Sequence, residues 1–233
     1  MPLADELKKK AAHRAVEYVS SGMVVGLGTG STVRFAVERI GEQLHNGQLK
    51  NILGIPSSIQ TQQLAQRLAI PLTILDEHPI IDLSIDGADE VDPQLNLIKG
   101  GGGALLREKI IAQASRRNVI VVDQSKLSPQ LGSHRALPVE VVPFARKTEE
   151  NYLNSLGASV TLRKTDEGQP FQTDQNNLIL DADFGPIADL NALVKKLTER
   201  AGIVEHGLFL GIADEVIVAA EFKIKHLKPN LEK

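Results

Sequence analysis

The sequence predicts an α/β protein with an open, Rossmann-like parallel sheet that has helices on both faces, together with a small α+β, ferredoxin-like domain. Short apolar runs alternate with helical patterns between residues 23 and 123, which indicates parallel strands joined by right-handed crossovers. After about residue 132 the order changes to strand, helix, strand, strand, helix. That order is typical of a small antiparallel sheet.

The chain has 233 residues, enough for one large domain or two small ones with a full core. We predict a catalytic α/β domain made of residues 1–132 and 205–233, and a small α+β domain made of residues 133–204. Hydrophobic residues make up 42% and charged residues 24%, which is ordinary for a globular protein. The N-terminal stretch is charged and amphipathic, unlike a signal sequence, and no apolar run has membrane-spanning length. We therefore expect a cytoplasmic protein that does not bind membranes.

Composition argues against several classes of function. The chain has no tryptophan, 3% aromatic residues and a net charge of −3, which argues against nucleic acid as a partner. The absence of cysteine excludes disulfides, thiolate nucleophiles and cysteine metal sites. The six histidines are scattered without the spacing of metal ligands, so we expect no metal site.

The first half of the chain contains the elements of the parallel sheet. A first helix is expected from a cap at Asp5 to about Ser20, with Leu7, Ala11 and Ala15 on one face. Apolar runs predict strands at 23–27, 51–55, 72–75, 81–85 and 118–123. Helical patterns follow Gly30, cover 59–69 and resume after Gly103.

The second half contains the small domain and a return to the first sheet. Strands are predicted at 137–142, 159–163 and 177–181, and helices at 146–156 and 189–200. The stretch 165–170 is predicted to be an exposed hairpin loop. Two further apolar strands, 207–210 and 216–219, are expected to rejoin the first sheet.

Two aspartates lie three residues apart just beyond a predicted strand, at Asp86 and Asp89. This is the edge at which α/β proteins bind ligands. The simplest alternative is an Asp-Gly turn with a capping aspartate. A magnesium site is a second alternative, but Lys99 would compete with a cation for both acids.

Lys99 precedes four glycines, Gly100 to Gly103. Such a run costs conformational entropy and indicates a backbone that bends sharply or approaches a ligand closely. Its N–H groups, beside a cation, would stabilise a developing oxyanion. A flexible linker is a poor explanation, because a helical pattern resumes at once.

Glu108 lies in a charged triplet between Arg107 and Lys109, where a solvated surface glutamate would be usual. Its spacing from Ala104 and Ile111, however, places it on a partly apolar helix face. Burial there would raise its pKa and make it a better base. The spacing alone leaves both interpretations open.

The stretch from Gly28 to Thr32, Gly-Thr-Gly-Ser-Thr, joins a predicted strand to a predicted helix. A glycine-rich turn with hydroxyls at a helix start suits a phosphate. The alternative is a tight turn with Ser31 as N-cap. The spacing fits neither a dinucleotide-binding fingerprint nor a P-loop.

Together these motifs resemble those of the type A ribose-5-phosphate isomerases. The resemblance is carried by Asp86-Gly87-Ala88-Asp89, by Ile98 to Gly102 and by Arg107-Glu108-Lys109. It extends to 28–32, to Asp123-Gln124-Ser125-Lys126 and to 137–141. The motifs occur in the expected order over nearly the whole chain.

The resemblance implies reversible interconversion of D-ribose 5-phosphate and D-ribulose 5-phosphate in the pentose phosphate pathway, through an enediolate and without metal or organic cofactor. It implies that Asp86 assists ring opening, Glu108 moves the proton, Lys99 stabilises the oxyanion and Asp89 orients groups around them. It also implies a homodimer or homotetramer. The substrate-binding residues that it implies are Thr29, Gly30, Ser31, Thr32, Asp86, Gly87, Ala88, Asp89, Lys99, Gly100, Gly101, Gly102, Lys126 and Lys8.

Two other classes of function stay open at this point. A regulatory module that senses sugar phosphates would need an output segment, and no helix-turn-helix pattern precedes the sheet. A sugar-phosphate deaminase or lactonase would be expected to use a catalytic histidine. No histidine lies between Asp86 and Glu108.

Overall fold

The computed structural model describes residues 3–221 and 223–229, and the chain divides into two compact units. The first unit consists of 1–88, 107–126 and 211–233, and the second of 89–106 and 127–210. Residues 1, 2, 222 and 230–233, which belong to the predicted catalytic domain, lie outside the described part. Because compactness does not test independent folding, the predicted division into domains stays a prediction.

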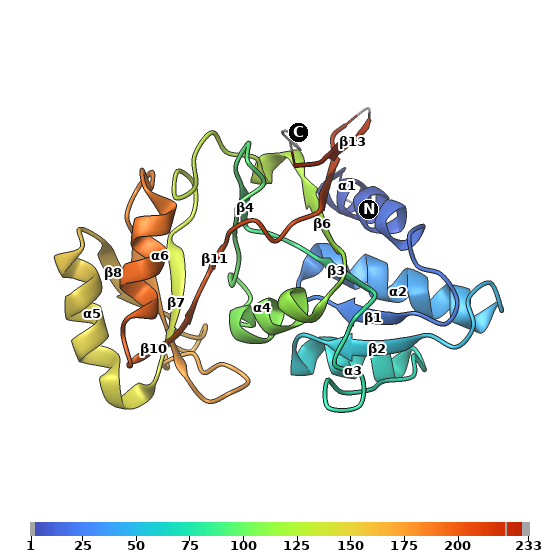
Figure 1. Ribbon diagram of the computed structural model, residues 1–233, viewed down its shortest axis with the longest axis horizontal. Helices are drawn as coiled ribbons and strands as arrows, with labels where there is room; N and C mark the ends of the chain where they lie inside the picture. The colour runs from blue at the N-terminus through green and yellow to red at the C-terminus, as the bar shows by residue number, and fades with distance from the viewer. Residues whose placement is uncertain (1–2, 222, 230–233) are drawn as a thin grey trace. The chain divides into compact units, whose positions relative to one another are not determined.

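The first unit contains a six-stranded sheet in the order β13-β12-β6-β3-β1-β2 (Figure 1). Its strands are β1 (Val24–Leu27), β2 (Leu53–Pro56), β3 (Leu83–Asp86), β6 (Asn118–Asp123), β12 (Glu215–Ala219) and β13 (Ile224–Leu227). Five of them run parallel, and β13 pairs antiparallel with β12 at the edge. The parallel sheet predicted from the sequence is thereby confirmed.

Helices cover both faces of this sheet. They are α1 (Leu3–Val16), α2 (Ser31–His45), α3 (Ile59–Arg67) and α4 (Leu105–Ala114). Val25 belongs to the core cluster that contains Ala11 of α1 and Val37 of α2. Its neighbour Val24 belongs to the cluster that contains Ile111 of α4, because successive strand residues point to opposite faces. No helix in the described residues is long and apolar enough to cross a membrane.

Two local expectations for the first unit are wrong. Asp5 does not cap α1 but lies in its first turn, where a carboxylate still suits the helix dipole. Residues 72–75 form no strand, although Thr73 N–H bonds to the carbonyl of Gly54 at 3.0 Å. The segment turns away because His78 N–H bonds back to the carbonyl of Ile74 at 3.0 Å.

The second unit contains a four-stranded antiparallel sheet in the order β10-β7-β9-β8. Its elements follow one another as β7 (Leu137–Val141), α5 (Arg146–Ser155), β8 (Ser159–Leu162), β9 (Leu178–Asp183), α6 (Leu190–Thr198) and β10 (Ile203–His206). This β-α-β-β-α-β succession is the ferredoxin-like arrangement. The small α+β fold is confirmed, with β10 as a strand that the sequence analysis missed.

A three-stranded sheet, β11-β5-β4, completes the second unit. It is made of β4 (Glu90–Val91), β5 (Leu97–Ile98) and β11 (Leu208–Phe209). The expectation that 207–210 rejoins the first sheet is therefore wrong. Gly207 explains the outcome, since its carbonyl accepts from Lys99 N–H at 2.9 Å and its N–H donates to the carbonyl of Pro138 at 2.8 Å.

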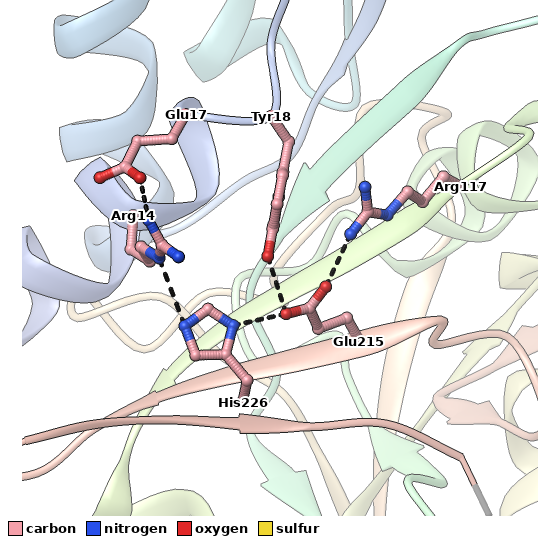
Figure 2. Close-up of polar contacts among 6 residues, drawn as sticks. All are labelled: Arg14, Glu17, Tyr18, Arg117, Glu215 and His226. Carbon is pink, nitrogen blue, oxygen red and sulfur yellow. Dashed lines mark hydrogen bonds and ion pairs between the residues drawn. The ribbon is translucent and has the colours of Figure 1, made fainter.

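A buried carboxylate ties the edge of the first sheet together (Figure 2). Glu215, at the start of β12, is 1% exposed and accepts hydrogen bonds from Tyr18 at 3.0 Å, from Arg117 at 2.7 Å and from His226 of β13. Arg14 Nε donates to Nε2 of His226 at 3.3 Å, and Nδ1 of the same ring bonds to Glu215. The network joins α1, the residue before β6, the start of β12 and the edge strand β13.

Burial alone would raise the pKa of Glu215, but the hydrogen bonds from His226, Tyr18 and Arg117 together hold that pKa below its ordinary value. A carboxyl with a lowered folded-state pKa stabilises the fold above its unfolded-state pKa, and this stabilisation is lost as pH falls through the folded-state pKa. We expect Glu215→Gln to cost about 1–3 kcal/mol of unfolding free energy at neutral pH. The cost should shrink as the pH falls below the ordinary carboxyl pKa of about 4.3 and disappear once the folded-state carboxyl is itself protonated.

Denaturant unfolding between pH 3 and 7 measures this difference. Glu42 provides the control, because it forms an exposed pair with Arg39 and Glu42→Gln should change stability by less than about 1 kcal/mol. A Glu215→Gln variant whose stability matches the Glu42→Gln variant across the whole range would contradict the prediction.

Candidate active site

The turn that follows β1 is shaped by Asp86, the last residue of β3. Thr29 N–H donates to Oδ1 of Asp86 at 3.1 Å and Gly87 N–H donates to the same oxygen at 2.7 Å. A Cβ atom on Gly28 would lie 2.2 Å from that oxygen and 2.7 Å from Asp86 Cα, so only glycine fits there. The carboxyl group, 7% exposed as a residue, is thereby held in place by backbone donors.

The side chain of Thr29 is occupied by contacts within the first unit. Its hydroxyl lies 2.7 Å from the hydroxyl of Ser57 and 2.8 Å from that of Ser58. Thr61 joins the same group and donates to the carbonyl of Gly28 at 2.8 Å. Thr29 thus fixes the shape of the turn, and its direct contact with substrate stays a prediction.

The start of α2 lacks a side-chain cap. Gly30 occupies the N-cap position with a φ of 116°, and Ser31 is the first helical residue, so the interpretation of Ser31 as N-cap is wrong. Ser31 is exposed and Thr32 is half-buried. Because no side chain of a described residue caps the helix, the N–H groups of its first turn suit an anion.

Asp89 lies at the start of the second unit, and Gly87 and Ala88, both half-buried, link it to Asp86. Its N–H donates to the carbonyl of Ile98 at 2.8 Å, which extends the pairing of β4 with β5. Its carboxylate accepts from Gly101 N–H at 2.7 Å. Asp89 therefore helps to shape the glycine run that follows β5.

Lys99 is a buried cation at the end of β5, with 3% of its surface exposed. Its Nζ lies 5.5 Å from the centre of the Phe209 ring, within the range of a cation–π interaction. The backbone bond to Gly207 fixes its main chain. A lysine is seldom buried this deeply unless it is paired, so Lys99 is not a solvated surface side chain.

The glycine run forms a turn that other side chains could not form. Gly100 and Gly103 have φ angles of 98° and 82°, in the region that favours glycine. Gly103 N–H closes the turn on the carbonyl of Gly100 at 3.0 Å. A Cβ on Gly101 would lie 2.6 Å from the carboxylate of Asp89. Gly101 and Gly102 are exposed.

Glu108 lies on α4 and is 5% exposed. The spacing had left its burial open, and the structure shows a buried side chain, with Ile111 of α4 and Ala104 just before the helix buried as well. The solvated surface glutamate of the simpler interpretation is therefore excluded. Lys109, which the sequence analysis did not single out, is also buried.

The two lysines proposed near a phosphate both lie in the first unit. Lys8 of α1 lies 4.0 Å from the carboxylate of Asp5. Lys126 ends the short 3-10 helix η1 (Gln124–Lys126), which Asp123 holds through the N–H of Ser125 at 2.9 Å. Within 3–221 and 223–229, no polar contact joins either lysine to residues 28–32, and no group of three acidic or histidine side chains could hold a metal ion.

Comparisons with known proteins agree with one another. The family description "Ribose 5-phosphate isomerase A (phosphoriboisomerase A)" matches residues 53–223. The chain belongs to this family. A ribose-5-phosphate isomerase A from Desulfatibacillum aliphaticivorans is 58% identical over 98% of this chain and 99% of its own length.

Solved isomerase structures have the same fold. A ribose 5-phosphate isomerase from Plasmodium falciparum is 40% identical and superposes with a TM-score of 0.94, covering 97% of this chain and 99% of its own. A D-ribose-5-phosphate isomerase in complex with phospho-erythronic acid has the same identity, TM-score and coverage. This isomerase is therefore an aldose-ketose isomerase by family, and the alternatives of a regulatory module, a deaminase or a lactonase are set aside.

Two features of the isomerase were out of reach of sequence reasoning. Phe209 lies against Lys99 from a position 110 residues later in the chain. Arg163 donates to carbonyls of the glycine run from 63 residues away. Neither residue belongs to a local motif, so only the pairing of distant strands brings them to their partners.

Proposed function

We propose that this isomerase interconverts D-ribose 5-phosphate and D-ribulose 5-phosphate with Asp86, Asp89, Lys99 and Glu108 as its catalytic residues. The observation that carries the proposal is the burial of Glu108 and Lys99, a carboxylate and a cation of the kind that enediolate chemistry needs. All four residues lie within one stretch of 23 positions that starts at Asp86, so the chain itself allows them to act on one substrate molecule.

The proposed reaction begins with ring opening. Asp86 assists movement of the proton between the ring oxygen and the anomeric hydroxyl of the furanose. Its fixed position, which the N–H groups of Thr29 and Gly87 maintain, suits this role because proton transfer needs donor and acceptor within hydrogen-bond reach.

Proton transfer between carbons follows in the open-chain sugar. Glu108 removes the proton from C2 of the aldose, the electrons of that C–H bond form the C1–C2 double bond, and the carbonyl oxygen becomes an enediolate oxyanion. Lys99 and the N–H groups of Gly100 and Gly102 stabilise that oxyanion, whereas the Gly101 N–H is donated to Asp89. A proton then moves from O2 to O1 with the help of Asp86, which places the negative charge on O2. Glu108 returns its proton to C1 as the electrons on O2 form the C2 carbonyl, which gives the ketose, while Asp89 orients the sugar hydroxyls or Lys99.

The phosphate group is proposed to lie at the start of α2, against Gly30, Ser31 and Thr32. The uncapped first turn of α2 supports this placement. Lys8 and Lys126 would add positive charge there. A phosphorylated sugar acid is the ligand of a solved relative, and we propose that the same class of ligand binds here.

A coupled assay tests the proposed function. Purified protein given D-ribose 5-phosphate in the presence of a chelator should form D-ribulose 5-phosphate, because the proposed chemistry uses no metal. D-Arabinose 5-phosphate, which has the opposite configuration at C2, serves as the control for specificity. Absence of turnover with ribose 5-phosphate, or activity that appears only when a divalent metal is restored, would overturn the proposal.

We also propose that the isomerase is cytoplasmic and that it assembles as a homodimer or homotetramer. Apolar side chains on the surface of the first unit, Ile74 and Ile110 at 55% and 42% exposure, support self-association. Sedimentation velocity in the presence of the coupled-assay reagents measures the size of the active species and so tests the assembly. Activity that sediments as a single 25.3 kDa chain would contradict it.

A further inference from the structure

Arg163 is held rigidly by a carboxylate on the neighbouring strand. It directly follows β8, and its N–H donates to the carbonyl of Ile179 on β9 at 2.9 Å. Its Nε donates to Asp181 at 2.9 Å and its Nη2 bonds to the other oxygen of the same carboxylate. The side chain is 15% exposed. Such a bidentate pair fixes the plane of the guanidinium.

The remaining nitrogen of this guanidinium reaches the glycine run. Nη1 of Arg163 donates to the carbonyl of Gly100 at 2.7 Å and to the carbonyl of Gly101 at 3.1 Å. The guanidinium of Arg163 thus donates hydrogen bonds to two consecutive peptide groups. Glycines have no side chains and few conformational restraints. The two hydrogen bonds from Arg163 therefore restrict the backbone conformation of the glycine run.

The orientation of the carbonyls determines the orientation of the amides. A peptide group is planar and trans, so its N–H points away from its carbonyl. In the group that joins Gly100 to Gly101, Arg163 holds the carbonyl and Asp89 accepts from the N–H at 2.7 Å. In the next group Arg163 holds the carbonyl of Gly101, which turns the N–H of Gly102 away from the guanidinium.

The segment after Arg163 supports the same turn. Phe171 N–H bonds to the carbonyl of Arg163 at 2.9 Å, and a Cβ on Gly103 would lie 2.4 Å from the Phe171 ring. Further along, Thr173 and Asn177 each donate to the buried Glu140 at 2.9 Å. Arg163 and Phe171 therefore both contact the glycine run from the segment 163–177, which hydrogen bonds to β9 and to Glu140 hold in place.

We propose that Arg163 is a positioning residue for the isomerase, which holds the carbonyls of Gly100 and Gly101 so that the N–H of Gly102 is presented to the substrate oxyanion. This inference rests on the proposed oxyanion role of the glycine amides. Arg163 itself touches no reacting atom, and its contribution comes through the geometry of the run.

Arg163→Met removes the donors and keeps most of the length of the side chain. We expect kcat to fall by about ten- to a hundredfold, because a displaced oxyanion donor acts on the chemical step. The KM for ribose 5-phosphate should change by less than about threefold, because the proposed phosphate site lies elsewhere. The inhibition constant of phospho-erythronic acid, whose carboxylate resembles the enediolate in charge, should rise with the loss in kcat.

Arg200 provides a matched control in the same unit. It forms a bidentate pair with Glu149 at 2.9 and 3.0 Å and lies 4.3 Å from the centre of the Tyr152 ring, but it has no contact with the glycine run. Arg200→Met should lower stability to an extent similar to Arg163→Met and leave kcat unchanged. Arg163→Lys, which retains one charged donor, should restore part of the kcat lost in Arg163→Met.

Hydrogen exchange gives a readout that does not depend on activity. Exchange of the amides in residues 99–104 should accelerate in Arg163→Met and stay at the wild-type rate in Arg200→Met, because only the first loses its hold on the run. Accelerated exchange with unchanged kcat would overturn the oxyanion role of the glycine amides. Unchanged exchange, with a loss of kcat no larger than in Arg200→Met, would overturn the positioning role of Arg163.

Discussion

Glu108→Gln is expected to lower kcat by about a hundred- to ten-thousandfold. Glutamine keeps the shape of the side chain and can still form hydrogen bonds at a site that is 5% exposed, but it cannot accept the C2 proton. Substrate binding should survive, since the proposed phosphate contacts lie at the start of α2 and at Lys8 and Lys126. Steady-state kinetics with ribose 5-phosphate measure the split between kcat and KM.

The proton transfer itself can be followed in heavy water. A carboxyl group that holds the proton between C2 and C1 can exchange it with solvent, so the wild-type product should contain deuterium at C1. Glu38→Gln on α2 serves as the control, since that glutamate pairs on the helix surface with Arg34 and its loss should leave kcat unchanged. Near-normal turnover by Glu108→Gln would end the assignment and make Asp86 the next candidate.

Lys99→Ala is expected to lower kcat by roughly a hundredfold or more. The cation is proposed to face an oxyanion that develops only on the way to the enediolate, so its loss should affect the chemical step more than substrate binding. Lys99 is also packed against Phe209, and alanine would leave a cavity there. Lys99→Met keeps the apolar stem over the ring, so an equal loss of kcat in that variant identifies the charge as the cause.

Lys195→Ala on α6 is the control for a lysine without such a role, because its side chain is exposed. Its kinetic constants should match those of the wild type. If Lys99→Met raises KM and leaves kcat unchanged, Lys99 binds the substrate in its ground state and the oxyanion assignment is wrong.

Much of the fold could be predicted, because most strands of the six-stranded and four-stranded sheets are visible in the sequence as apolar runs. The buried parallel strands read as continuous apolar runs, and the prediction of 118–123 coincides with β6. The strands that were missed are short or polar. β4 and β5 have two residues each, too few for any periodicity, and β13 carries Lys225 and His226 in its centre. Their pairing depends on partners far away in the sequence.

The candidate site shows the same division. The partly apolar face that carries Glu108 could be predicted from its spacing to Ala104 and Ile111, but the burial of the side chain could not, because it depends on what packs against that face. The hydrogen bonds from Arg163 to the glycine run could not be predicted in this way. Arg163 and Asp181 come together only when β8 pairs with β9. A glycine-rich turn can be recognised in a sequence, whereas the distant side chains that fix its conformation cannot.

The order of strands in the first sheet has a consequence for synthesis on the ribosome. β6 lies between β3 and β12, but β12 emerges roughly ninety residues after β6, a delay of about 5–18 s at typical translation rates. During that interval the ferredoxin-like elements are made while one edge of β6, later paired with β12 at five positions, stays open. An open apolar edge invites pairing with other chains. We therefore expect a chain truncated before Glu215 to aggregate more readily than the full chain, because the edge of β6 that β12 covers would stay unpaired.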